Sequence, residues 1–158
     1  MRTAIRILAL CGVIFIVAFA FRVLVPYYQQ QQDEPIQTES QDQVRRIMSA
    51  ISQFVEQDPE HRFPSNLAEV PSLVTSGTTN LEAVWSKFVY LPPPPHASKA
   101  ELFGRVVLLE RLGHYRYKEG GYGGNAGSQT PGWYTMRDYK TVAEKNGVSL
   151  EQLSEHQK

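Results

Sequence analysis

ILALCGVIFIVAFAFRVLV, residues 7–25, is apolar at every position except Arg22. A helix needs about 20 apolar residues to cross the hydrocarbon core of a bilayer, which is about 30 Å thick. The run from Ile7 to Val25 meets this requirement if the Arg22 guanidinium extends along the helix to the polar interface. The sequence therefore predicts a membrane-spanning helix over Ile7 to Val25, with the lipid bilayer as its partner.

Charges on either side of this helix predict its orientation. Arg2 and Arg6 lie in the segment 1–6, whereas Asp33 and Glu34 are the first charged residues beyond the helix. Basic residues that flank a membrane helix stay in the cytoplasm. We expect a cytoplasmic segment at 1–6 and a single pass through the cytoplasmic membrane, with the remaining chain outside, in the periplasm.

A cleaved signal peptide is the alternative interpretation. Ala18-Phe19-Ala20 matches the A-x-A pattern of a cleavage site that follows a basic start and an apolar run. Cleavage after Ala20 would release a soluble domain. The apolar run continues past Ala20 to Val25, which a signal peptide does not require, and this favours a retained anchor. Cys11, the only cysteine, lies inside the run, so no disulfide is expected.

Composition narrows the class of partner. The 158 residues include 16 basic and 16 acidic side chains. Three arginines and no acid precede Pro26, so the remaining chain carries 13 basic against 16 acidic residues. This mild acidity argues against nucleic acid as a partner. Without an anchor and a linker about 115 residues remain, enough for one domain.

Residues 26–41 are predicted to form a linker. Pro26 and Pro35 remove backbone donors, and the glutamine run between them offers no apolar surface for burial. Ser40-x-x-Gln43 then matches a capping box, which predicts the start of an amphipathic helix and of a domain over 42–158. The apolar side chains of that helix recur at three- and four-residue steps: Val44, Ile47, Met48, Ile51, Phe54 and Val55.

The rest of the domain is predicted to be α+β. Phe63 is expected to anchor a turn, and Leu67, Val70 and Leu73 to face the core. Segments rich in β-branched and aromatic residues predict strands at Trp85 to Leu91, Arg105 to Glu110, Trp133 to Arg137 and, as a short return strand, Tyr139 to Val142. Other segments predict a polyproline spacer at Pro92 to Pro95, a glycine-rich surface loop at Glu119 to Thr130, and a capped terminal helix after Ser149-x-x-Gln152.

The fold class that follows is an N-terminal transmembrane helix, then an amphipathic helix packed on a small, mostly antiparallel sheet, with a short C-terminal helix. Four runs stand in this order after the anchor: RFPSNLAEV (62–70), FVYL (88–91), VLLE (107–110) and WYTMRDYKTV (133–142). This order resembles the pseudopilin-related proteins of the type II secretion G-like kind. The resemblance implies a membrane helix joined to a small sheet, and a subunit or accessory role in a secretion or pilus-type assembly. The chain departs from that pattern because no acid precedes Asp33 and because Asp138-Tyr139 stands where an Asp-Gly turn is expected.

No residue pattern predicts a catalytic, cofactor-binding or metal site. The four histidines lack zinc-ligand spacing: His61, His96, His114 and His156. Two of Glu101, Glu110 and Asp138 could form the acid pair of a glycoside hydrolase, which needs two carboxyl groups about 5 to 9.5 Å apart. No Gly-x-Ser-x-Gly elbow accompanies them.

We therefore expect a non-enzymatic, membrane-anchored envelope protein that engages other envelope proteins and needs no cofactor. The alternative function is a secreted or periplasmic binding domain, released after Ala20. Such a domain would contact polysaccharide or peptide through the Tyr- and Gly-rich segment from Tyr115 to Tyr134, because aromatic side chains on loops suit such contacts.

Overall fold

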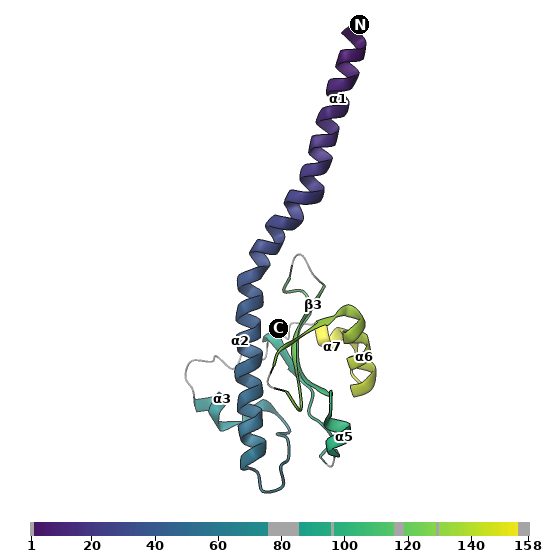
Figure 1. The fold of residues 1–158 in the computed structure, drawn as a ribbon. Coiled ribbons are helices and arrows are strands. Elements are labelled where there is room, and N and C mark those ends of the chain that lie inside the picture. The colour runs from purple at the N-terminus through teal and green to yellow at the C-terminus, as the bar shows by residue number, and fades with distance from the viewer. Residues whose placement is uncertain (1, 76–85, 96, 116–118, 129, 155–158) are drawn as a thin grey trace.

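One continuous helical rod leads from the N-terminus into an α+β domain (Figure 1). The computed structural model describes residues 2–75, 86–95, 97–115, 119–128 and 130–154. The rod consists of α1 (Arg2–Phe19), a π-helical turn η1 (Ala20–Leu24) and α2 (Val25–Gln57). The prediction of one long apolar N-terminal helix followed by an antiparallel sheet is thus confirmed.

The π-helical turn lies directly before Pro26. A proline ring in a helix crowds the carbonyl group four residues earlier, which here belongs to Arg22, inside the turn. A π-helical turn widens the helix locally and so accommodates the missing hydrogen bond. Pro26 therefore changes the helix locally without ending it.

The segment 26–41 was predicted to be a linker that ends at a helix cap near Ser40, and the structure contradicts this start of the helix. The segment is helical throughout, with Pro35 inside α2. Ser40 is not a capping residue; it is buried in mid-helix, and its hydroxyl donates a 2.7 Å hydrogen bond to the Glu110 carboxylate. Gln41 donates a 2.7 Å bond to the Tyr122 hydroxyl. These contacts with the sheet stabilise the helix where local sequence preference would end it.

Four antiparallel strands form a sheet in chain order. They are β1 (Phe88–Tyr90), β2 (Val106–Glu110), β3 (Gly120–Asn125) and β4 (Gly132–Thr135). The strand predicted at Arg105 to Glu110 is confirmed as β2, which pairs with both β1 and β3 and is buried at every residue. A register shift between Val106 and Leu108 interrupts the usual alternation, so that Val107 and Leu108 belong to one core cluster while Val106 and Leu109 belong to the other.

The predicted glycine-rich surface loop is wrong, because half of it, Gly120–Asn125, is strand β3, which is buried except at Asn125. Glycine is required there by close packing. A Cβ atom at Gly124 would lie 2.5 Å from Cγ of Met48 on α2, and one at Gly121 would lie 2.4 Å from the Tyr139 hydroxyl oxygen. Helices on both faces therefore approach this strand too closely for a side chain.

Two helices follow the last strand. The predicted return strand at Tyr139 to Val142 is wrong, because α6 (Met136–Asn146) occupies it. A reciprocal capping box between Thr135 and Asp138 opens α6. The predicted cap of the terminal helix α7 (Leu150–Ser154) is confirmed, because Ser149 and Gln152 exchange hydrogen bonds of 2.9 and 3.1 Å.

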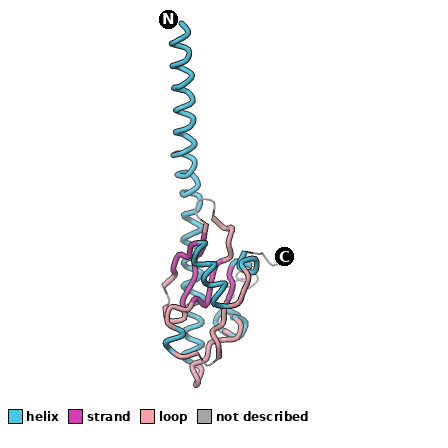
Figure 2. Tube along the Cα trace, turned by 90° about the vertical axis from the view of Figure 1, so that its right-hand side faces the viewer, coloured by secondary structure: helices cyan, strands magenta, loops and turns pink. Residues whose placement is uncertain are grey.

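The sheet lies between two helical layers (Figure 2). On one face α2 packs with the short helices η2 (Leu67–Glu69) and α3 (Pro71–Thr75). Leu67, Val70 and Leu73 are buried there, as predicted. On the other face, Tyr139, Val142 and Leu153 of α6 and α7 pack against Leu109. A short helix α5 (Lys99–Leu102) precedes β2.

Candidate functional site

The apolar helix is the most distinctive surface of the molecule. It extends beyond the α+β domain, and no other described element lies beside it (Figures 1 and 2). Phe15, Ile16 and Phe21 have exposed fractions of 73%, 67% and 70%. The helix is long and apolar enough to cross a membrane. Water would solvate such a surface at high cost, so an apolar environment is the stable one for it.

The Glu110 carboxylate occupies the centre of the domain and not an open cleft. The residue has no exposed surface. Oε1 accepts a bond from Ser40, and Oε2 accepts 2.7 and 2.9 Å bonds from the Tyr115 hydroxyl and the Tyr122 amide. Lys87 Nζ lies 3.9 Å from Oε1. These contacts match those of a structural carboxylate that joins helix to sheet.

Burial and the Glu110 charge affect the nearby tyrosines. Burial raises the pKa of the Tyr115 hydroxyl above its usual value, and the neighbouring Glu110 carboxylate acts in the same direction. The same two causes raise the pKa of Tyr139, whose hydroxyl donates to the Glu110 backbone carbonyl oxygen. Both phenols therefore stay protonated and serve as hydrogen-bond donors across the physiological pH range.

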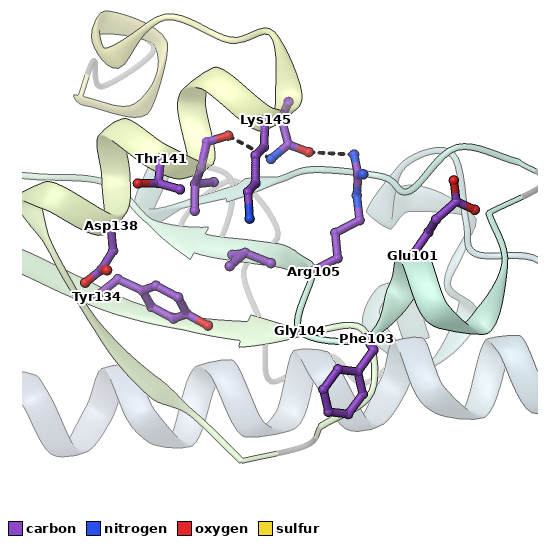
Figure 3. Close-up of a pocket in the computed structure, with 11 residues that line it drawn as sticks. Glu101, Phe103, Gly104, Arg105, Tyr134, Asp138, Thr141 and Lys145 are labelled. Atoms are coloured by element: carbon purple, nitrogen blue, oxygen red, sulfur yellow. Dashed lines mark hydrogen bonds between the residues drawn. The ribbon is translucent and has the colours of Figure 1, made fainter.

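The other two predicted acids line one cavity of about 250 Å³ between α6 and the residues before β2. Figure 3 shows Asp138 and Glu101 at opposite ends of the lining, with Lys145 and Arg105 between them. The Thr135 hydroxyl and backbone amide lower the pKa of Asp138, and the Ser98 amide and hydroxyl lower that of Glu101. Both carboxylates are therefore ionised helix caps, and neither has the raised pKa of a general acid.

Sequence reasoning missed the basic side chains of this cavity. Arg105 comes from the turn before β2, where its Nη2 donates a 2.7 Å bond to the Asn146 side chain at the end of α6. Lys145 lies in the last turn of α6 and points into the space between Arg105 and Tyr134 (Figure 3). Arg105 and Lys145 are 40 positions apart and share no motif, so nothing in the sequence indicated that they would line the same cavity.

The described histidines do not form a site. The His61 ring Nδ1 donates to the Val55 carbonyl oxygen at 3.1 Å, at the end of α2. His114 lies in the turn after β2. His96 and His156 lie outside the described residues. Among the residues that the structure describes, no group of three histidine, cysteine or acidic side chains is placed to hold a metal ion.

A second cavity, of about 660 Å³, opens beside the polyproline segment from Pro92 to Pro95. Phe54 and Phe63 line it, together with Asp58 and Arg62, which form a 3.0 Å ion pair with each other. Phe63 packs on the core and so anchors the turn after α2, as predicted. The polyproline segment is thus one wall of an aromatic groove.

Three described aromatic residues of the segment from Tyr115 to Tyr134 form one packed cluster. Tyr115, Tyr122 and Trp133 contact one another edge to face, with ring centroids 5.1 to 6.4 Å apart. Tyr122 belongs to β3 and Trp133 to β4. Edge-to-face clusters of this kind are packing contacts. Among the described residues of this segment, Tyr122 and Trp133 therefore lie in strands and pack against Tyr115.

No protein-family model, no curated protein and no solved structure matches this chain.

Proposed function

We propose that this protein is a membrane-anchored, non-enzymatic envelope protein. The helix from Ile7 to Val25 crosses the cytoplasmic membrane with residues 1–6 inside, and the α+β domain lies on the periplasmic side. There the domain acts as a pseudopilin-like subunit or accessory component of a secretion or pilus-type assembly, in contact with other envelope proteins.

The observation that carries this proposal is the continuity of the exposed apolar helix with the core of the domain. Residues 25–57 form one helix whose second half buries Val44, Ile47 and Ile51 against the sheet. The exposed part, up to Val25, precedes it without a break in helical structure. A rod of this kind orients the folded domain relative to a bilayer, which a flexible tether would not do.

The three acids considered for catalysis are not arranged as a glycosidase requires. Glu110 is enclosed and hydrogen-bonded, while Glu101 and Asp138 cap helices and lie at opposite ends of their cavity. A glycosidase needs two carboxyl groups that flank one bond, with one of them held protonated. The helix followed by an antiparallel sheet agrees with the layout that the pseudopilin resemblance implies.

Extraction and reporter fusions test the membrane part. We expect the full-length chain to stay in the membrane pellet after carbonate washing and to dissolve only with detergent. A periplasm-dependent phosphatase fused after Lys158 should be active, and a fluorescent protein that matures only in the cytoplasm should stay dark.

Two matched variants sharpen this test. Ile14→Asp with Ile16→Asp should abolish retention in the pellet, because each charge at a helix centre costs about 2.5 to 3.5 kcal/mol. The control variant carries Gln30→Asp and Gln31→Asp, beyond the apolar run, and should stay in the membrane pellet. A full-length wild-type chain in the soluble fraction would contradict membrane anchoring.

The assembly part is tested separately by chemical cross-linking in intact cells, followed by purification from detergent extracts. We expect the chain to cross-link to other envelope proteins. A chain that stays uncross-linked and purifies alone from native membranes would contradict a subunit role while leaving the anchor intact.

A further inference from the structure

The cavity between α6 and the turn before β2 is lined by two basic side chains with no ion-pair partner among the described residues. The Arg105 guanidinium donates only to the neutral Asn146 amide oxygen, and its buried Nε has no hydrogen-bond acceptor among the described residues. Lys145 is exposed, and Figure 3 shows it directed into the cavity. A guanidinium and an ammonium facing one space attract an anion, and carboxylates are the group that a guanidinium fork matches best.

No ion pair is formed between the acids at the ends of the cavity and these two cations, although, after the Ser98 hydrogen bonds, the charge of Arg105 contributes to the lowered pKa of Glu101. Asp138 Oδ2 accepts two 2.7 Å bonds from Thr135, and Glu101 Oε2 accepts 2.7 and 2.8 Å bonds from Ser98. Each carboxylate is thereby held at its own helix start. In Figure 3 the Asp138 carboxylate points away from Lys145.

We propose that this cavity receives a single aspartate or glutamate side chain of a partner protein, bound by Arg105 and Lys145. This rests on the proposed function, because it names the chemistry by which the anchored domain would contact another envelope protein. The cavity is about 250 Å³, below the roughly 300 to 1,000 Å³ of typical small-molecule sites.

Size and charge select the occupant. The space suits one side chain rather than a sugar chain. The flanking Glu101 and Asp138 would repel a polymer with a carboxylate on every unit, whereas a lone acid among neutral or basic neighbours would meet only the central cations. A uronic-acid polysaccharide is therefore the disfavoured source of the carboxylate.

Ligand-observed NMR on the full-length protein in uncharged detergent micelles tests this. The probe is N-acetylglutamate amide, whose only charge is its side-chain carboxylate, and N-acetylglutamine amide is its neutral isostere. We expect saturation transfer to the glutamate probe, weakened by added salt, and little transfer to the glutamine probe. Equal transfer to both probes would overturn carboxylate recognition.

Variants locate the site. Lys145→Gln should weaken binding of the glutamate probe about three- to fivefold, as expected for loss of one exposed charge contact. Lys140→Gln, an exposed lysine of the same helix that does not line the cavity, should leave binding unchanged. Unchanged binding in Lys145→Gln would overturn the proposal.

A third ligand separates the two sources of carboxylate. Glucuronate should give weaker transfer than the glutamate probe, and equal or stronger transfer would overturn the assignment to a protein side chain. None of these readouts depends on membrane topology. Failure of this proposal is therefore distinguishable from failure of the membrane anchor, which extraction and reporter fusions test.

Discussion

The Ser40 hydroxyl donates a 2.7 Å hydrogen bond to the Glu110 carboxylate across 70 positions of the sequence, and neither residue has exposed surface. This contact joins the helical rod to the central strand. Glu110 also accepts bonds from Tyr115 and the Tyr122 amide, so one carboxylate connects α2, β2, β3 and the turn between the strands. It holds the rod on the sheet together with the apolar contacts of Val44, Ile47 and Ile51.

Removing this carboxylate should destabilise the domain strongly. We expect Glu110→Ala to lower the free energy of unfolding by about 3 to 5 kcal/mol, because several buried donors lose their acceptor at once. Ser40→Ala should cost less, about 1 to 2 kcal/mol, because one donor is removed with its bond. Denaturant unfolding of the full-length chain in micelles measures both.

The matched control for this pair is Glu144→Ala, an exposed carboxylate on α6, which should change stability by no more than about 0.5 kcal/mol. If Glu110→Ala were as mild as Glu144→Ala, the carboxylate would not connect the rod to the sheet.

The glycines of β3 give a second prediction. A Cβ at Gly121 would lie 2.4 Å from the Tyr139 hydroxyl oxygen and 3.0 Å from Glu110 Cβ. We expect Gly121→Ala to destabilise the domain by about 1 to 3 kcal/mol, the usual cost of overpacking. Thermal and denaturant unfolding of the full-length chain provide the measurement.

Two further variants isolate the cause. Gly127→Ala, where no atom lies within 4 Å of the added Cβ, should be nearly neutral. The double variant Gly121→Ala with Tyr139→Phe should lose less free energy of unfolding than the sum of the two single variants, because phenylalanine lacks the hydroxyl that lies closest to the added Cβ. Strict additivity would show that the Tyr139 hydroxyl does not limit this position.

Local patterns predicted the elements whose structure depends on nearby residues. The apolar stripe from Val44 to Val55, the buried strand β2 and the cap of α7 are of this kind. From the sequence alone, the glycines of β3 indicate a turn. In the structure they belong to a strand, because Met48 and Tyr139 approach it closely from opposite faces and leave no room for side chains. Contacts remote in sequence decide such positions.

The same limit applies to α6, the linker and the cavity. Tyr139 to Val142 has the composition of a strand, but the capping box at Thr135 starts a helix before it. Ser40 has the signature of a cap, yet its partner Glu110 is a distant residue. Arg105 and Lys145 belong to different elements, so their meeting follows from the packing of α6 on the sheet.

The cap of α6 predicts a pH dependence. The Thr135 hydroxyl and amide lower the pKa of Asp138 from its usual value. Because the folded-state pKa lies below the unfolded one, the stabilisation is present above about pH 4 and is lost as the pH falls through the folded-state value. We therefore expect Asp138→Asn to reduce the loss of stability between pH 7 and pH 3, measured by unfolding at each pH.

Thr135→Val should act in the same direction, because it removes the hydroxyl that lowers the pKa most. Glu144→Gln is the control, because it changes an acid of the same helix that forms no capping box. The Glu144→Gln variant should lose more stability between pH 7 and pH 3 than the Asp138→Asn variant does. An acid dependence in Asp138→Asn identical to that of the wild type would exclude the cap as its source.

Pro35 gives the last prediction, since it lies inside α2 and cannot donate to the Gln31 carbonyl oxygen. Proline costs about 3 kcal/mol more than alanine in a helix interior, so Pro35→Ala should strengthen the rod between the membrane helix and the domain. Hydrogen exchange followed by mass spectrometry on the full-length chain should show slower exchange in peptides covering residues 27–39. Peptides covering residues 47–55, which pack on the sheet, should exchange as in the wild type. Faster exchange over 27–39 in Pro35→Ala would mean that the proline favours the helix there, and that the continuity of the rod depends on it.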